Sequence, residues 1–144
     1  MLAAEYFRMR CQAVEAVCNM IEQLEMMLEF EAPTVSEMLR QIKRQSLRLP
    51  KFIFALSDGS DAQAAVESIR KMGDEYDECD RLRLEELFMQ LGSADKECER
   101  QRLASAHAYF SQRLKQLRQE TQRRCRLAKN LGLLGGAFLA VILI

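Results

Sequence analysis

The sequence predicts an all-α protein: an antiparallel bundle of about six helices with a long last helix leading into a C-terminal membrane helix. Three observations predict this fold class. The 144 residues include only 6 Gly and 2 Pro, very few for the tight turns of a sheet protein. Apolar residues recur at helical spacing along most of the chain, and no strand pattern competes with them. No residue from Leu131 to Ile144 carries a charge.

Composition narrows the class of function. Apolar residues make up 49% and charged residues 29% of the chain, which is typical of a folded protein. Because 21 basic residues balance 21 acidic ones, net charge gives no argument for a nucleic-acid partner. The five cysteines form no Cys-x-x-Cys pair, so we expect reduced thiols that mostly pack in a cytosol-facing domain.

The first element is a helix from Ala3 to Phe30. Pro33 ends it. Its apolar residues repeat every seven positions, which predicts a seam that faces another long helix. The residues of this seam are Phe7, Val14, Ile21 and Leu28, with Val17 and Leu24 between them.

Two shorter helices are predicted next. The run Thr34–Glu37 has the Ser/Thr-x-x-Glu form of a capping box and predicts a second helix that ends near Leu49 and Pro50. Pro50 suits the first turn of a short apolar helix through Phe52–Leu56.

The turn-forming run Ser57–Asp61 precedes a fourth helix, with Ser60 or Asp61 as its N-cap and Gly73 at its end. An acidic segment, 74–78, then leads into a fifth helix. Gly92 is expected to end that helix in the left-handed conformation.

Ser93 or Asp95 should begin the last and longest helix. No helix breaker interrupts it between about residue 95 and the end of the basic segment. Its seam residues are Leu103, Phe110 and Leu117, interleaved with His107, Leu114 and Thr121.

The C-terminal segment divides the chain into a cytoplasmic bundle, 1–126, and a transmembrane segment, 127–144. Residues 131–144 would span about 21 Å as a helix, and a start at Leu127 with Lys129 snorkelling raises this to about 27 Å. A buried terminal core helix is the alternative, but a small bundle cannot cover a helix that is apolar on all faces. The basic residues before it predict a cytoplasmic body.

Two sets of residues are candidates for membrane contacts. Small residues four apart, on one stripe of the helix, could pack against another membrane helix; they are Gly132, Gly136 and Ala140. The basic residues just before them could rest on anionic headgroups; they are Arg123, Arg124, Arg126 and Lys129.

The acidic segment is a candidate docking surface for a basic partner. Its candidate residues are Asp74, Glu75, Asp77 and Glu78, and the acidic character extends to Glu86. A solvated helix face with no partner is the alternative reading.

No catalytic, cofactor-binding or metal site is expected. The sequence contains no Gly-rich phosphate loop, no Gly-x-Ser-x-Gly and no His-Glu-x-x-His. The only histidine, His107, sits on the long last helix, where a semi-buried structural role is favoured over a general base. We therefore expect a non-enzymatic protein with no cofactor and no small-molecule substrate.

Three segments, taken in order, resemble the stage III sporulation protein AB family of endospore-forming bacteria. Residues 24–39 resemble its early pattern, in which a helix leads through a Thr-Pro type of turn into the next helix. Residues 87–95 are similar to its central Leu-Gly-x-x-Asp turn. Residues 129–136, running into the apolar end, resemble its terminal Leu-Gly-apolar-x-Gly membrane segment.

The resemblance implies a mother-cell membrane protein that faces the forespore. Its helical bundle would be related to the cytoplasmic domains of the type II secretion inner-membrane platform protein. The implied partners are the other proteins of the stage III sporulation complex, including a secretion-type ATPase. The implied function is a platform that docks this ATPase in a channel complex between mother cell and forespore.

The resemblance also implies a membrane helix ahead of the first bundle helix, and Met1–Glu5 is where that helix would be ending. A second function class stays open beside the platform: a tail-anchored helical adaptor that binds a partner peptide in an apolar groove.

Overall fold

The computed structural model describes residues 2–30, 34–45, 48–57, 59–72, 75–92 and 95–143, and in these ranges it consists of helices without any strand. This confirms the all-α class. The six helices are α1 (Leu2–Phe30), α2 (Val35–Gln45), α3 (Lys51–Phe54), α4 (Ala62–Met72), α5 (Glu78–Gln90) and α6 (Lys96–Leu143).

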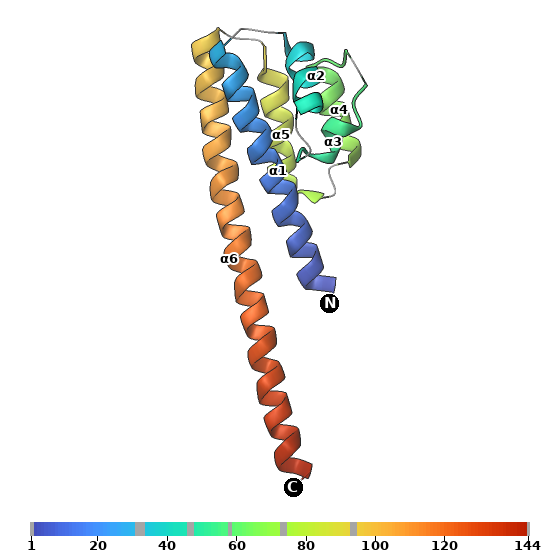
Figure 1. Ribbon diagram of the computed structural model, residues 1–144, viewed down its shortest axis with the longest axis vertical. Helices are drawn as coiled ribbons and strands as arrows, with labels where there is room; N and C mark the ends of the chain where they lie inside the picture. The colour runs from blue at the N-terminus through green and yellow to red at the C-terminus, as the bar shows by residue number, and fades with distance from the viewer. Residues whose placement is uncertain are drawn as a thin grey trace.

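The two long helices run antiparallel side by side, and α6 continues far beyond the start of α1 (Figure 1). The predicted seams form the contact between them. On α1, Val14, Val17, Ile21, Leu24 and Leu28 are all buried, while Phe7 is half-buried near the open end. On α6 the seam residues Leu103, Phe110, Leu114 and Leu117 are buried.

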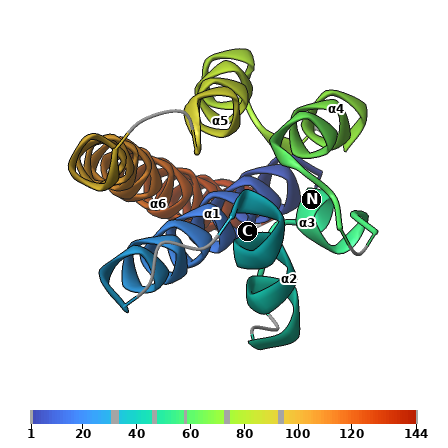
Figure 2. The ribbon, with the colours of Figure 1, turned by 90° about the horizontal axis from the view of Figure 1, so that it is seen from above.

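The four shorter helices gather around one end of α1, with α6 along its remaining side (Figure 2). Aromatic residues from different short elements meet in this region. The Phe52 ring meets the Phe88 ring edge-on at 5.8 Å between centroids, and it meets Tyr76 at 6.5 Å. Each such edge-to-face pair stabilises the fold by about 0.5–1.5 kcal/mol beyond the contribution of the area that it buries. The Tyr76 hydroxyl donates to the Ala13 carbonyl oxygen at 3.3 Å, and burial raises the pKa of this tyrosine.

Helix ends follow the predicted caps with one correction. The second helix is described as Val35–Gln45 and does not extend to Leu49, because Pro50 disfavours the helical conformation at Leu49 and itself occupies the N-cap position of α3. The Thr34 hydroxyl accepts a hydrogen bond from the Glu37 amide at 3.3 Å, as the capping box predicts. Gly92 adopts φ +84°, the left-handed conformation predicted for it.

Aspartates provide two further N-caps. The Asp95 carboxylate accepts the Cys98 amide at 2.9 Å, and this hydrogen bond lowers the pKa of Asp95. The Asp61 carboxylate accepts the Ala64 amide at 2.9 Å. For α4 the sequence predicts Ser60 or Asp61, and Asp61 is the capping residue. For α6 it predicts Ser93 or Asp95; Asp95 is a capping residue, and Ser93 lies outside the described residues.

Replacing Asp61 by alanine should lower the free energy of unfolding by about 1 kcal/mol, because the first turn of α4 loses its side-chain acceptor. Thermal unfolding of the full chain in mild detergent, followed by circular dichroism, measures the change. Asp61→Ser retains a capping oxygen and should cost much less. Equal losses for the alanine and serine variants would contradict the capping role.

Candidate interaction surfaces

The C-terminal part of α6 leaves the bundle as a bare apolar helix (Figure 1). α6 contains an 18-residue stretch that is long and apolar enough to cross a membrane, and none of that stretch is buried. Leu133 is 74% exposed and Leu143 is 83% exposed. Because each large apolar side chain left in water forgoes about 1.5–3 kcal/mol, this segment requires an apolar environment. The structure therefore agrees with membrane association.

The junction between bundle and apolar segment contains no break. α6 continues through the predicted boundary at residues 126 and 127 as one helix from Lys96 to Leu143. The small-residue stripe Gly132, Gly136 and Ala140 faces open space, since a Cβ built on either glycine would meet nothing within 4 Å. A helix–helix contact at this stripe stays a prediction.

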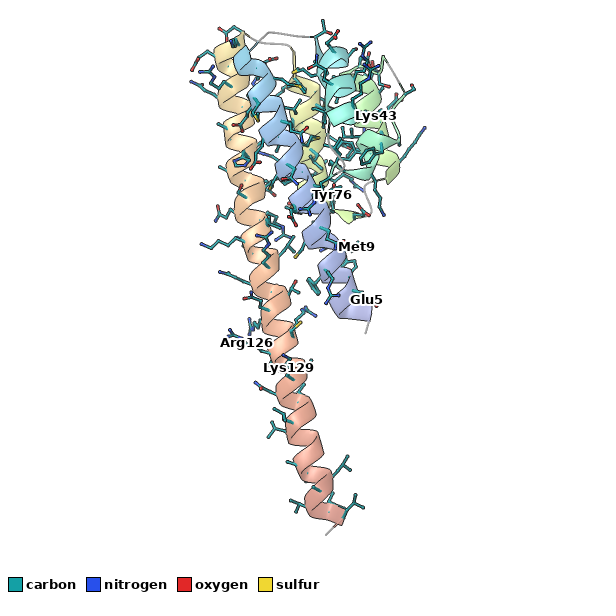
Figure 3. The ribbon with its side chains drawn as sticks, viewed as in Figure 1. Glu5, Met9, Lys43, Tyr76, Arg126 and Lys129 are labelled. Atoms are coloured by element: carbon teal, nitrogen blue, oxygen red, sulfur yellow. The ribbon has the colours of Figure 1, made fainter. Side chains whose placement is uncertain are left out.

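The four basic residues of the predicted membrane surface are all exposed on α6. Arg126 and Lys129 lie on the part of α6 below the first turns of α1, beyond Glu5 (Figure 3). Arg124 is held more closely: its guanidinium lies 4.1 Å from the centroid of the Phe7 ring and its Nε lies 3.4 Å from the Glu120 carboxylate. This position between the bundle and an apolar helix fits a contact with anionic headgroups, which stays a prediction.

The acidic segment is largely used inside the molecule. The Asp77 carboxylate pairs with both Arg10 and Arg113, so it bridges α1 and α6 at the start of α5. Although Asp77 stands at the N-cap position of α5, its side chain makes no capping hydrogen bond, because these two arginines engage it.

Asp80, one turn later, is the most deeply buried of these carboxylates, with its side chain 3% exposed. It accepts the Tyr109 hydroxyl at 2.9 Å and Nε of Arg113 at 3.1 Å. Partial burial raises the pKa of Tyr109 and the hydrogen bond to Asp80 raises it further, so the phenol remains a donor at neutral pH. We call Arg10, Asp77, Asp80, Tyr109 and Arg113 the charge cluster.

The other predicted docking residues differ in their surroundings. Glu75 forms an ion pair with Lys51 at 2.7 Å, and this pairing raises the pKa of the lysine. Glu78 is exposed, and no partner for it occurs among the described residues; the same holds for Glu86. Asp74 lies outside the described residues. The docking surface stays a prediction, and Glu78 and Glu86 are its accessible carboxylates.

Residues that could carry chemistry are dispersed. Nε2 of His107 lies 3.1 Å from the Glu22 carboxylate, so this half-buried histidine joins α6 to α1. All five cysteines are free. The predicted packing role fits Cys18, which is buried, and Cys11, which is half-buried; it is wrong for the other three, which are exposed on helix surfaces. In the described ranges, no three residues of the types that bind metals come together.

The charge cluster was not predicted as a unit. Sequence spacing placed its acidic members on an exposed face, and no local signal connects Arg10 or Arg113 with them. Two signals could have suggested a structural role: Asp80 is three residues from Asp77, on one helix face, and Arg113 stands one turn from the seam residue Phe110.

Comparison with known protein families shows that residues 1–144 match the family described as stage III sporulation protein AB. Neither a curated protein nor a solved structure matches the chain.

Proposed function

The chain belongs to the stage III sporulation protein AB family, and from this premise we propose that it is a non-enzymatic membrane platform that docks a cytoplasmic ATPase. The family indicates a role in stage III of sporulation. The platform would form part of a secretion-like channel complex between mother cell and forespore, with the other proteins of that complex as its partners. It would require no cofactor.

The observation that carries the proposal is the single helix α6. A helix from Lys96 to Leu143 joins the bundle to the apolar segment without a break near Lys129. Its first half is clamped to α1 along a buried seam, and its second half stands free of the bundle. A helix held in this way can pass a displacement or torque from a protein docked on the bundle to membrane components.

The proposed location is the mother-cell membrane that faces the forespore, with the bundle in the cytoplasm. The cytoplasmic position of the bundle is supported by the four basic residues at 123–129 on the bundle side of the apolar segment, because cytoplasmic flanks of membrane helices are enriched in Lys and Arg.

We place the ATPase contact at the start and outer face of α5, around Glu78 and Glu86. Both carboxylates are exposed and lack partners in the described part of the chain, whereas Asp77 and Asp80 are committed to the charge cluster. Charge reversal at Asp77 or Asp80 would disrupt the fold and would therefore not test docking.

The test is co-purification of the membrane-inserted protein with the ATPase of the same sporulation complex, after membrane fractionation. The double variant Glu78→Lys, Glu86→Lys should lower ATPase capture roughly fivefold or more, because it replaces two attractive charges with repulsive ones. The matched control is Glu37→Lys, Glu97→Lys, which makes the same charge change at exposed residues in the first turns of α2 and α6. It should leave capture unchanged.

Three results would contradict the proposal. A chain that stays in the soluble fraction would remove the membrane platform. Membrane insertion without ATPase capture would remove the docking role. Equal losses in both double variants would place the contact elsewhere or reduce it to net charge.

The tail-anchored adaptor gains no support from the cavities formed by described residues. Three of them, of about 490, 560 and 380 Å³, are lined mainly by polar and charged side chains rather than by an apolar groove.

A further inference from the structure

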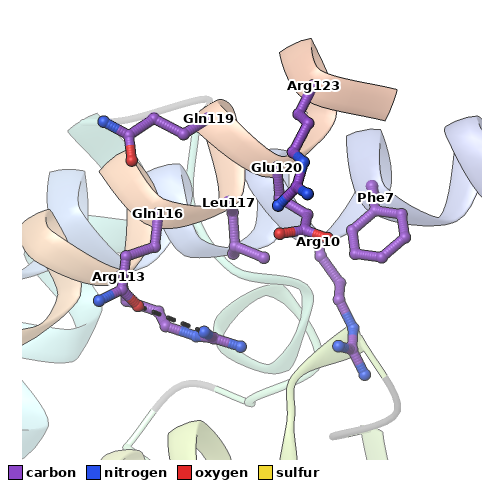
Figure 4. A pocket seen from close by; sticks show the side chains of 8 residues that line it. All are labelled: Phe7, Arg10, Arg113, Gln116, Leu117, Gln119, Glu120 and Arg123. Carbon is purple, nitrogen blue, oxygen red and sulfur yellow. Dashed lines mark hydrogen bonds between the residues drawn. The ribbon is translucent and has the colours of Figure 1, made fainter. Parts of the chain in front are cut away.

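A cavity of about 490 Å³ lies between the first turns of α1 and the part of α6 that leads toward the membrane (Figure 4). Three arginines from these two helices line it: Arg10, Arg113 and Arg123. Among the described residues one carboxylate, that of Glu120, lines it with them. Phe7 and Leu117 provide apolar wall, and Gln116 and Gln119 complete the lining.

The charges around this cavity do not balance. Glu120 is shared with Arg124, whose Nε lies 3.4 Å from its carboxylate. Asp77 pairs with Arg10 and Arg113, and Asp80 pairs with Arg113. The lining residues and these ion-pair partners comprise four arginines and three carboxylates, so one positive charge has no counterpart among them. Arg123 forms no ion pair or hydrogen bond within the described ranges.

A second observation concerns Arg10. Its Nε is buried and has no hydrogen-bond acceptor among the described residues. A buried guanidinium N–H without an acceptor is costly, and an anion held between the arginines would supply an acceptor if the Arg10 side chain turned toward the cavity. Guanidinium groups are suited to phosphate oxygens because they present donors in a fixed planar fork.

The cavity also lies at a suitable height for a lipid headgroup. Arg123 is four residues before Leu127, which is about 6 Å along the helix axis. The headgroup layer on each side of a bilayer is about 5–8 Å thick, so the Arg123 side chain reaches it when the apolar segment spans the membrane. Phe7, which lies at the level of Arg124 on α6, would then face the glycerol part of the lipid.

We propose that this cavity binds the phosphodiester group of one anionic phospholipid, between Arg123 and Arg10, with the lipid's glycerol part against Phe7. One phosphodiester carries a single negative charge, which is the charge that the cavity lacks. The proposal rests on membrane insertion, which belongs to the proposed function, but not on the ATPase contact. It assigns to Arg123 a role different from that of the neighbouring basic residues, which contact the membrane surface without a defined site.

The experiment compares the full chain with Arg123→Gln and Arg126→Gln. Each protein is reconstituted in vesicles of equal parts phosphatidylglycerol and phosphatidylcholine, its insertion is confirmed by alkaline extraction, and it is then taken up in a neutral detergent. Native mass spectrometry counts the lipids that remain bound. Arg126 is a matched control because it is exposed on the same helix three residues later and does not line the cavity.

The unsubstituted protein should retain one phosphatidylglycerol and no phosphatidylcholine. Arg123→Gln should weaken this retention about tenfold, since a charge-assisted hydrogen bond to phosphate is lost, while Arg126→Gln should leave it unchanged. Equal weakening by both variants would overturn the site in favour of general attraction to the surface.

Two further outcomes separate the sources of phosphate. If inorganic phosphate displaces the lipid at equal concentration, the lipid assignment is wrong and the cavity is a site for free phosphate. Retention of phosphatidylcholine to the same extent would remove the role of charge. A protein that inserts normally and retains no lipid would overturn this inference and leave the platform proposal standing. One that fails to insert would overturn both.

Discussion

Replacing Asp80 by alanine should lower the free energy of unfolding by about 3 kcal/mol. Removal of one partner from a buried ion pair costs about 3–5 kcal/mol, and the lower end applies because Arg113 keeps 27% of its side chain exposed to solvent. The variant leaves Asp77 as the remaining described carboxylate partner of Arg113 and leaves the Tyr109 hydroxyl without its acceptor. Denaturant unfolding of the full chain in mild detergent, followed by circular dichroism, measures this loss.

Glu78→Ala is the control for this prediction. Glu78 is on the same turn of α5, but it is exposed and has no partner in the described chain, so its loss should change stability by less than about 0.5 kcal/mol. Tyr109→Phe removes only one hydrogen bond to Asp80 and should cost about 1 kcal/mol. Similar values for Asp80→Ala and Glu78→Ala would show that the charge cluster does not hold the bundle together.

Replacing Gly92 by alanine should cost roughly 2–4 kcal/mol, the second large effect. Two causes add. Gly92 has φ +84°, where an L side chain is strained by about 1–2 kcal/mol. A Cβ at this position would also lie 2.8 Å from Cγ2 of Val35, so the Val35 side chain or the backbone of α2 would have to shift.

Gly59 separates the two causes because it has nearly the same conformation without the contact. Its φ is +83°, and an added Cβ would meet nothing within 4 Å. Gly59→Ala should therefore cost only about 1–2 kcal/mol, the strain alone. In a Val35→Ala background, Gly92→Ala should lose most of its excess over Gly59→Ala, and the coupling between the two sites measures the clash. Equal costs at Gly92 and Gly59 in the natural background would exclude it.

Gly92 also contributes through its backbone. Its amide donates to the carboxylate of Glu99, which is buried in the first turn of α6. This hydrogen bond links the end of α5 to the start of α6, so the turn is fixed both by the glycine conformation and by a side chain seven residues later. A shift that accommodates a Cβ would disturb this bond as well, which is a further reason to expect a large effect.

The platform and the lipid site both depend on the part of α6 between the buried seam and the apolar segment. Transmission of force requires α6 to remain one helix between the seam and the apolar segment. A lipid bound between Arg10 and Arg123 would connect the first turns of α1 to α6 at the membrane surface. It would therefore stiffen α6 where this helix leaves the bundle. Both proposals therefore require a stiff α6, although separate residues carry them and separate experiments test them.

Local patterns in the sequence determined the helices, their order and most of their ends. Heptad spacing at Val14, Ile21, Leu103 and Phe110 identified the faces that α1 and α6 bury against each other, because a helix places every seventh residue on one side. Caps and breakers act over three or four residues, which is why Gly92 could be predicted and the N-caps of α4 and α6 could each be narrowed to a serine or an aspartate. The lack of charge after Leu131 likewise needed no tertiary information to indicate a membrane segment.

Only the tertiary structure decided the role of the acidic segment. The sequence around Asp77 and Asp80 is typical of a solvated helix face. Yet Asp77 pairs with Arg10, 67 residues earlier, and with Arg113, 36 residues later. Asp80 also pairs with Arg113, 33 residues later. Sequence spacing carries no information on such pairs, because charged side chains follow no periodic pattern and their pairing depends on how α1, α5 and α6 approach one another. For the same reason the cavity that Arg10, Arg113 and Arg123 line appears only once the two long helices are placed side by side.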